Sequence, residues 1–292
     1  MERRSRSYLQ LIKPGITLSN TLSGVAGFFL AASIIHYDFT VMATIFFGTI
    51  FGIAFVIASA CVLNNVLDRD IDKRMKRTAK RDVASGVISV RKALLFAGIL
   101  GVIGLSLLML YTNTLTFILG VIAYVWYIVI YGIAKRTTAY STIVGGVAGA
   151  LPPMAGYTAL TGRLDAGAVI LFLILFFWQM PHFYAIAMFR QKDYASAKLP
   201  VWSVVYGMKS AKRQILLFTV VYAIVSVLLT VFGYTGIIYL VLSIALSVYW
   251  LYRGISLYNK LEDDKWARKM FGASLLILLA ILFLISIGGF LP

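Results

Sequence analysis

The sequence has one cysteine and few charged residues. Because Cys61 has no second cysteine to pair with, neither an internal disulfide nor a Cys-x-x-Cys metal site can form. Charged residues make up 13% of the chain and hydrophobic residues 61%, whereas a soluble domain is about one quarter charged and roughly half apolar. These values exclude an ordinary soluble domain and indicate a protein that crosses a membrane several times.

Long uncharged stretches divide the chain into membrane spans. A helix needs about 20 apolar residues to cross a bilayer. Two of the stretches are long enough for two spans, and residues that favour turns interrupt them at 112–114 and 233–236. The apolar runs are continuous rather than alternating, which favours helices over a β-barrel. We predict one all-α transmembrane domain, residues 1–292, with nine helices at about 14–35, 40–66, 93–111, 115–134, 138–161, 167–189, 214–232, 236–253 and 270–290.

The positive charge is distributed very unevenly. Nine spans place the termini on opposite sides, and 26 of the 27 lysines and arginines then fall on the side of the N-terminus, with only Arg163 on the other. By the positive-inside rule, this predicts a multi-pass protein of a prokaryotic cell membrane with its N-terminus in the cytoplasm and its C-terminus outside. The net charge of +16 is then a topology signal and not a sign of nucleic-acid binding. The first apolar segment has no cleavage signal nearby and is expected to be a retained helix.

Two long polar segments, 68–92 and 190–213, lie on the predicted cytoplasmic side. Segments longer than a connection requires are usually functional, so we expect the chemistry to face the cytoplasm.

The end of the second predicted helix carries an acidic motif. Asn64, Asp68 and Asp72 are four residues apart, so on a helix they lie on one face, each about 6 Å from the next, with Asp70 on the opposite side. Such hard oxygen ligands hold Mg²⁺ by one or two carboxylates while phosphates complete the shell. A charged helix end entering water is the simpler interpretation. Against it, Asn64 and Asn65 lie inside a span, where polar side chains usually face a cavity.

The segment NNVLDRDIDKRMKRTAKR, residues 64–81, resembles the first aspartate-rich motif of the UbiA superfamily of intramembrane prenyltransferases. The resemblance covers essentially the whole chain. It implies a nine-helix bundle with a central cavity open to the cytoplasm, and transfer of an isoprenoid from a diphosphate. It also implies Mg²⁺ as cofactor, held through Asn64, Asp68 and Asp72.

The second acidic motif of that superfamily, Asp-x-x-x-Asp, is incomplete in this chain. Phe189 and Ala197 stand four residues before and after Asp193, so only one carboxylate remains. This puts a full second metal site in doubt, and Arg190 and Lys192 could instead offset phosphate charge.

Other features resemble the branch of the superfamily that farnesylates haem. They are Lys13-Pro14 at the first span, the stretch 145–153, and Trp178-Gln-Met-Pro-His182-Phe183. The resemblance implies haem B and farnesyl diphosphate as substrates. Farnesyl transfer to a haem vinyl group, with water addition, would give haem O for haem A and terminal oxidase biogenesis. The alternatives are a prenyltransferase acting on a quinone precursor or other aromatic acceptor and, more distantly, a secondary transporter. The sequence leaves open whether a haem A synthase docks to the protein.

Several further residues are candidates for substrate binding. His182 lies inside an otherwise uncharged span beside Pro181, and a neutral imidazole is a common haem ligand, so we expect it to hold or orient haem. A hydrogen bond to a neighbouring helix is the alternative. The predicted catalytic set is Asn64, Asp68, Asp72 and Asp193. The positive-inside rule alone predicts basic residues at the cytoplasmic ends of the spans. The residues that we predict to bind diphosphate are Arg77, Arg81, Lys135, Arg136 and Arg190.

Overall fold

The computed structural model describes residues 2–292 and the side chains from Ser7 onward. In this part of the chain every regular element is helical, and nine helices are long and apolar enough to cross a membrane. The predicted all-α fold with nine membrane-length helices is therefore confirmed. The elements are α1 (Glu2–Leu11), α2 (Pro14–Ala32), α3 (Phe39–Leu67), α4 (Arg69–Arg74), α5 (Val90–Tyr111), α6 (Thr114–Val125), the π-helical turn η1 (Trp126–Ile130), α7 (Tyr131–Thr137), α8 (Ser141–Thr161), α9 (Ala166–Phe189), α10 (Gln191–Ser196), α11 (Trp202–Val205), α12 (Gly207–Ser226), α13 (Leu228–Val231), α14 (Ile237–Ser256) and α15 (Asp263–Gly288).

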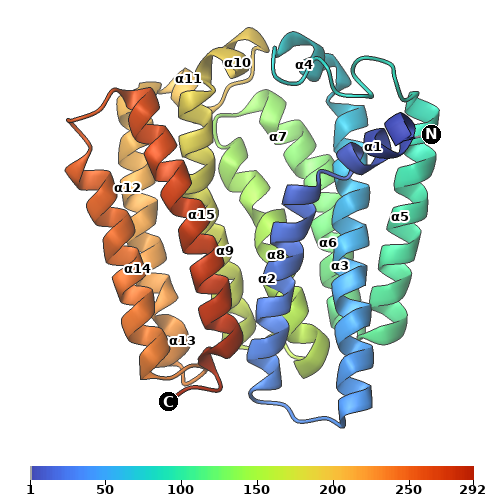
Figure 1. Ribbon diagram of the computed structural model, residues 1–292, viewed down its shortest axis with the longest axis vertical. Helices are drawn as coiled ribbons and strands as arrows, with labels where there is room; N and C mark the ends of the chain where they lie inside the picture. Colours follow the sequence, from blue (N-terminus) through green and yellow to red (C-terminus); the bar gives the residue numbers. More distant parts are fainter. Residues whose placement is uncertain (1) are drawn as a thin grey trace.

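The long helices form a closed bundle (Figure 1). Helix α2 packs against α3, α8 and α15, and α9 packs against α8, α12 and α15. Helix α3 packs against α5, and α14 packs against α12 and α15. The largest buried cluster joins α2, α8, α9, α12 and α15, while a smaller one joins α3 to α5. Of the membrane-length helices, α8 is the most enclosed, and 72% of its most apolar 18-residue stretch is buried.

Small residues allow α2 and α8 to approach closely. A Cβ atom on Gly27 would lie 1.9 Å from the Pro153 carbonyl oxygen, and one on Gly156 would lie 1.9 Å from the Gly24 carbonyl oxygen. Neither position has room for a side chain, as is common where membrane helices pack backbone to backbone. This contact fixes α2, and with it the residues that precede α2, against the centre of the bundle.

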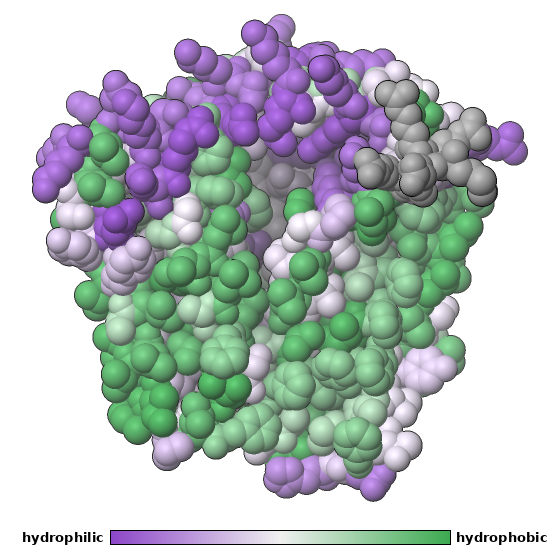
Figure 2. All heavy atoms as spheres, in the orientation of Figure 1, coloured by the Kyte–Doolittle hydropathy of each residue, from purple (hydrophilic) through white to green (hydrophobic). Residues whose placement is uncertain are grey.

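The surface is divided between an apolar belt and a polar end (Figure 2). Large apolar side chains are exposed along the outer helices, for example Leu95, Val102 and Leu110 of α5 and Val248 of α14. Hydrophilic residues gather at the end that carries α1, α4, α10 and α11, and the surface is hollowed below them, between α15 and α2 (Figures 1 and 2). The protein is thus a multi-pass membrane protein whose polar segments lie together at one end.

Two helices begin earlier than the apolar runs suggest. Helix α12 begins at Gly207 and α15 at Asp263, whereas the spans were placed at 214 and 270. The apolar run marks where a helix enters the bilayer, but the same helix continues through a polar turn beyond that boundary. These extra turns carry charged residues, among them Lys209 and Lys212 of α12 and Asp263 of α15.

Candidate active site

The acidic motif lies where α3 ends. The predicted single helix is interrupted, because α3 ends at Leu67 and Asp68 has φ −93° and ψ 4° before α4 begins. The spacing of one turn nevertheless persists. The Asp68 amide donates to the Asn64 carbonyl at 2.9 Å, and the Asp72 amide donates to the Asp68 carbonyl at 2.7 Å. The Asn64 side-chain amide also donates to the Asp68 carboxylate at 2.9 Å. We call Asn64, Asp68 and Asp72 the acidic ladder.

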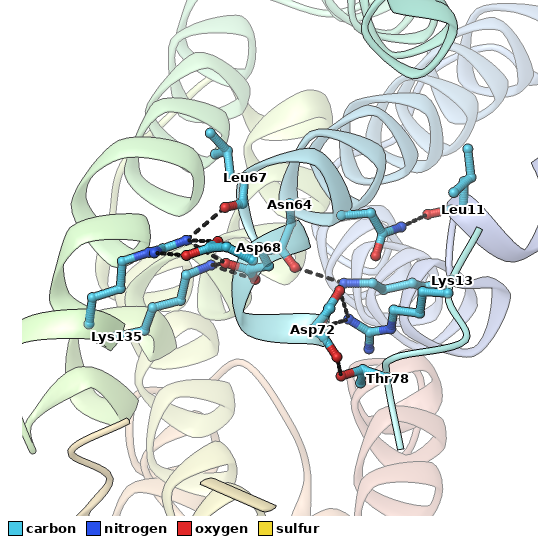
Figure 3. A network of polar contacts seen from close by, with 12 residues as sticks. Leu11, Lys13, Asn64, Leu67, Asp68, Asp72, Thr78 and Lys135 are labelled. Atoms are coloured by element: carbon cyan, nitrogen blue, oxygen red, sulfur yellow. Dashed lines mark hydrogen bonds and ion pairs between the residues drawn. The ribbon is translucent and has the colours of Figure 1, made fainter. Parts of the chain in front are cut away.

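Each member of the acidic ladder has a basic partner (Figure 3). Lys13 Nζ donates to Asn64 Oδ1 at 2.8 Å, and Lys135 Nζ donates to Asp68 Oδ2 at 2.7 Å. Arg81 Nη1 donates to both carboxylate oxygens of Asp72 at 2.9 Å. Asp72 is only 1% exposed, and a carboxylate at that depth requires such a partner. Three cations from three separate parts of the chain therefore converge on one turn-spaced set of oxygens.

Asp70 lies apart from the acidic ladder, as its position in the motif predicts. Its carboxylate accepts hydrogen bonds from Arg136 Nη1 and Nη2 at 3.0 and 2.9 Å. The hydrogen bond from the Arg136 guanidinium lowers the pKa of the Asp70 carboxyl to about 2. Arg136 also donates to the Leu67 carbonyl at 2.7 Å. Its guanidinium is thus occupied on the exposed side of the α3 end, 3.7 Å from Asp68 at its closest.

The segment after α9 packs against the acidic segment. A buried apolar cluster joins Ile71 and Met75 to Ala187, Leu199 and Val201. In addition, the Ser196 hydroxyl, at the end of α10, donates to the Arg74 carbonyl at 3.3 Å. The two long polar segments therefore form one structure at the polar end of the bundle.

Asp193 is brought to this structure without a second carboxylate. It lies 3.9 Å from Arg190, a distance that allows an ion pair but not a hydrogen bond. Burial raises the pKa of the neighbouring Tyr194 phenol, while the positive charges of Arg77, Arg190 and Arg81 lower it. Tyr194 thus lies within the electrostatic reach of the basic residues from both polar segments, although Arg77 itself is exposed.

His182 lies in the interior against α15. Its Nδ1 is 2.7 Å from the Ser274 hydroxyl, and its ring packs against those of Trp178 and Phe271, with centroid distances of 4.8 and 4.9 Å. The Ser274 hydroxyl donates its only hydrogen to the Phe271 carbonyl at 2.6 Å and so accepts the bond from His182. This arrangement places the proton on Nδ1 and leaves a lone pair on Nε2, the nitrogen that would be free to ligate iron.

Sequence reasoning missed Lys13 as a site residue. It precedes Pro14 and adopts left-handed backbone angles, φ 49° and ψ 70°, at the kink between α1 and α2. Those angles are uncommon for a residue with a side chain, and the kink leaves the ammonium group in contact with Asn64. Burial lowers the pKa of Lys13, while Asp68 and Asp72 oppose that shift. The sequence signal for Lys13 was its position as a basic residue at a predicted span boundary. Its partner Asn64 is 51 positions away, so no local pattern joins the two residues.

Two tyrosines of the fourth span were missed as well. Tyr127 and Tyr131 stack with a centroid distance of 5.4 Å, and Lys135 Nζ lies 5.4 Å from the Tyr131 ring centroid. Tyr127 falls in the π-helical turn η1, a distortion that often marks functional sites. The spacing of four between these residues was visible in the sequence and would have placed them on one face with Lys135.

The acidic ladder fits a divalent cation that is shared with a phosphate ligand. No group of three or more histidine, cysteine, aspartate or glutamate side chains that could hold a metal occurs in residues 7–292, so the protein offers no complete metal cage there. Two carboxylates and one amide oxygen are nevertheless the partial shell that Mg²⁺ takes when phosphates supply the remaining ligands. In this structure Lys13, Lys135 and Arg81 contact these oxygens, so a metal would have to share the oxygens with these cations, and a diphosphate would supply the further negative charge.

Comparison with known proteins agrees with this architecture. Residues 21–287 match the UbiA prenyltransferase family. The chain is 44% identical to protoheme IX farnesyltransferase 1 of Shewanella frigidimarina, over 95% of this chain and 91% of that protein. It is 43% identical to protoheme IX farnesyltransferase of Salmonella arizonae, over 98% of this chain and 96% of that protein. The fold is similar to the structure of a UbiA homolog from Archaeoglobus fulgidus bound to GPP and Mg2+, with a TM-score of 0.72, 18% identity and coverage of 96% and 99% of the two chains.

Nine membrane-length helices within residues 2–292, with an acidic ladder at the polar end of their bundle, define the class of membrane-embedded prenyltransferases. This chain belongs to the UbiA prenyltransferase family. The resemblance stated from residues 64–81 is thereby confirmed.

Proposed function

We propose that this protein transfers the farnesyl group of farnesyl diphosphate to a vinyl group of haem B, with water addition, to give haem O. The observation that carries the prenyl-transfer part is the acidic ladder with its three cationic partners. The choice of acceptor is supported by relatives named protoheme IX farnesyltransferase, which are 43 and 44% identical to this chain over more than nine tenths of its length.

Asn64, Asp68 and Asp72 would hold Mg²⁺ together with the diphosphate. When bound, the metal would stabilise the negative charge that develops on the leaving diphosphate. The neighbouring cationic side chains would stabilise the same negative charge on the diphosphate. Arg81 and Lys135 already contact the acidic ladder and would turn part of their donors to phosphate oxygens. Because an ammonium carries three donors and a guanidinium five, each can bind phosphate and carboxylate together.

Three further arginines, Arg77, Arg136 and Arg190, complete the proposed diphosphate-binding residues. The reason differs for each of them. Arg77 is exposed and has no carboxylate partner in residues 7–292, so its guanidinium is available. Arg136 would have to release Asp70 to reach a phosphate. Arg190 is loosely paired with Asp193 and extends over the Phe189 ring, 5.6 Å from its centroid. Asp193 would orient Arg190 rather than hold a second metal.

His182 is proposed as a haem-binding residue. The proton on Nδ1 is committed to Ser274, so Nε2 is the nitrogen that would face iron. Trp178 and Phe271, whose rings pack against the imidazole, give it apolar neighbours that suit a porphyrin. Titration of haem B into wild type and His182→Ala, followed by the Soret band, tests this role. We expect weaker binding and an altered spectrum in the variant, and identical curves would remove His182 from the site.

The charge distribution supports the proposed orientation in the membrane. With the polar end in the cytoplasm, the acidic ladder would open to the cytoplasm of a prokaryotic cell, where the positive charges belong. The N-terminus would lie inside and the C-terminus outside. A haem A synthase that takes up the haem O product is the partner that this reaction would serve.

The direct test uses purified protein with haem B, farnesyl diphosphate and Mg²⁺, and identifies the products by mass. We expect a haem carrying one farnesyl group and one added water, with release of diphosphate that depends on Mg²⁺. Farnesyl transfer to a quinone precursor, with haem B unchanged, would support the other prenyltransferase class. Absence of diphosphate release with any acceptor would refute the enzyme assignment at this site.

A further inference from the structure

A basic cavity lies at the polar end of the bundle, on the side of α12, α14 and α15. It has a volume of about 420 Å³. Figure 1 places these helices across the bundle from α3 and α4, so the cavity is separate from the acidic ladder. The residues that line it are Lys209, Lys212 and Arg213 of α12, Tyr258, Asn259 and Leu261 of the connection between α14 and α15, and Asp263 at the start of α15.

Lys212 forms the base of this cavity. It is 4% exposed, and its ammonium group donates to the Tyr258 carbonyl at 2.6 Å and to Asp263 Oδ1 at 3.0 Å. The same group lies 4.2 Å from the Tyr258 ring centroid and 5.0 Å from that of Trp266. An ammonium group fixed by a carboxylate, a carbonyl and two aromatic rings is a built structural element and not a mobile surface lysine. It ties α12 to the start of α15.

The rim of the cavity carries positive charge that no acid neutralises. Asp263 balances Lys212, whereas Lys209 and Arg213 are exposed and have no ion pair within residues 7–292. They are four residues apart and so lie on one face of α12. At the acidic ladder, by contrast, each base that contacts it faces a carboxylate or an amide oxygen. Two uncompensated charges beside a cavity are suited to an anion.

An exposed apolar stripe continues from this rim into the membrane region. Leu217, Val220 and Ile224 follow Arg213 at helical spacing and are 54, 40 and 59% exposed. Arg213 therefore stands at the boundary between the polar end and the apolar belt, with the stripe below it. This order, a basic cavity above and an apolar track along the same helix face, matches a phospholipid with its headgroup in the cavity and an acyl chain along the stripe.

We propose that this cavity binds the phosphate headgroup of an anionic phospholipid. Lys209 and Arg213 pair with the phosphate oxygens, and the Asn259 side-chain amide is placed at the cavity to donate to the same headgroup. Basic pockets between membrane helices at the cytoplasmic side bind anionic headgroups in this way. The positive-inside rule alone would account for basic residues at the cytoplasmic end of α12. It does not account for their arrangement around a cavity that also contains a buried, fixed lysine.

The test is lipid binding by the full-length protein in detergent, measured by native mass spectrometry with phosphatidylglycerol and phosphatidylcholine of the same acyl chains. Wild type should retain phosphatidylglycerol in preference to phosphatidylcholine. Because each basic residue near a membrane surface contributes about 1 kcal/mol, the double variant Lys209→Gln/Arg213→Gln should bind phosphatidylglycerol roughly 30-fold more weakly.

A matched control removes one arginine and one lysine elsewhere at the same end of the molecule. Arg91 and Lys92, at the start of α5, are exposed and do not line the cavity. Arg91→Gln/Lys92→Gln should bind phosphatidylglycerol like wild type, and the charge exchange Lys209→Arg/Arg213→Lys should retain most of the binding. Normal thermal unfolding of all variants without added lipid excludes misfolding as the cause.

Three outcomes would overturn the proposal. The first is an equal loss of binding in the cavity variant and the α5 control, which would reduce the effect to overall charge. The second is no preference of wild type for phosphatidylglycerol. The third is displacement of the lipid by inorganic phosphate or diphosphate at concentrations similar to those of the lipid, which would indicate a site for a free anion.

Discussion

Two of the segments at the polar end, the one around the end of α3 and the one after α9, are built differently. After α3 an asparagine and two aspartates stand one turn apart, and each side chain contacts a cation. After α9 a single aspartate lies 3.9 Å from one arginine. The first segment concentrates oxygen ligands, whereas the second contributes positive charge and packing. On the proposed function, the first segment would therefore hold the metal and the second would support it with positive charge.

Apolar packing explains why the second segment persists without a second carboxylate. Ile71 and Met75 of the first segment are buried against Leu199 and Val201 of the second. Removing a carboxylate from the second segment leaves this interface intact. The position of Tyr194, which packs against this cluster, therefore depends on buried apolar area rather than on charge pairing.

The largest expected effect comes from the first segment. Asp72→Ala removes a carboxylate that is buried, accepts two hydrogen bonds from Arg81, and is a proposed metal ligand. Turnover should fall by at least about 100-fold, the loss typical of one electrostatic stabiliser, and more Mg²⁺ should be needed. Steady-state turnover against Mg²⁺ concentration measures both effects.

Asp82→Ala serves as the control for Asp72→Ala. Asp82 lies in the same polar segment and has no ion pair in residues 7–292, so its replacement should leave turnover near that of wild type. If Asp72→Ala turned over near normally with unchanged chelator sensitivity, the metal assignment would be wrong.

The second segment should respond more weakly. Asp193→Asn removes one charge that orients Arg190 but no proposed metal ligand, so we expect about a 10-fold rise in KM for farnesyl diphosphate with the Mg²⁺ requirement unchanged. Initial rates over a grid of both concentrations separate the two parameters. A loss as large as that of Asp72→Ala, together with a higher Mg²⁺ requirement, would reveal a second metal site and abolish the distinction between the segments.

The sequence predicts one part of this comparison better than the other. Nine helices follow from apolar runs, because the bilayer imposes a length and a composition on each span. The acidic ladder follows from a spacing of four, a local property that survives the break at Asp68.

The partners of these residues depend on the tertiary fold. Lys13 reaches Asn64 across 51 positions, Lys135 reaches Asp68 across 67, and His182 reaches Ser274 across 92. No local pattern encodes such contacts. Helices α12 and α15 also extend beyond the predicted spans and begin at Gly207 and Asp263, because hydropathy marks the membrane boundary and not the end of the helical hydrogen bonds.

The smallest effect is expected at Asp70, which shares the motif but not the acidic ladder. Its pKa is lowered to about 2 from an ordinary 3.8, mainly by the hydrogen bond from Arg136. A carboxyl with a lowered folded-state pKa stabilises the protein above its ordinary pKa and loses that contribution as the pH falls through about 2. Because the Asp70 side chain is 49% exposed, solvent screens the pair, which should contribute at most about 1 kcal/mol.

We therefore expect Asp70→Asn to keep turnover within about twofold of wild type and to lower Tm slightly. The decrease in Tm should be the same at pH 5 and pH 7, since both lie above the titration range. Thermal unfolding at the two pH values and steady-state turnover measure these effects. If turnover fell as far as in Asp72→Ala, Asp70 would belong to the metal site, because release of Arg136 alone leaves every oxygen of the acidic ladder in place.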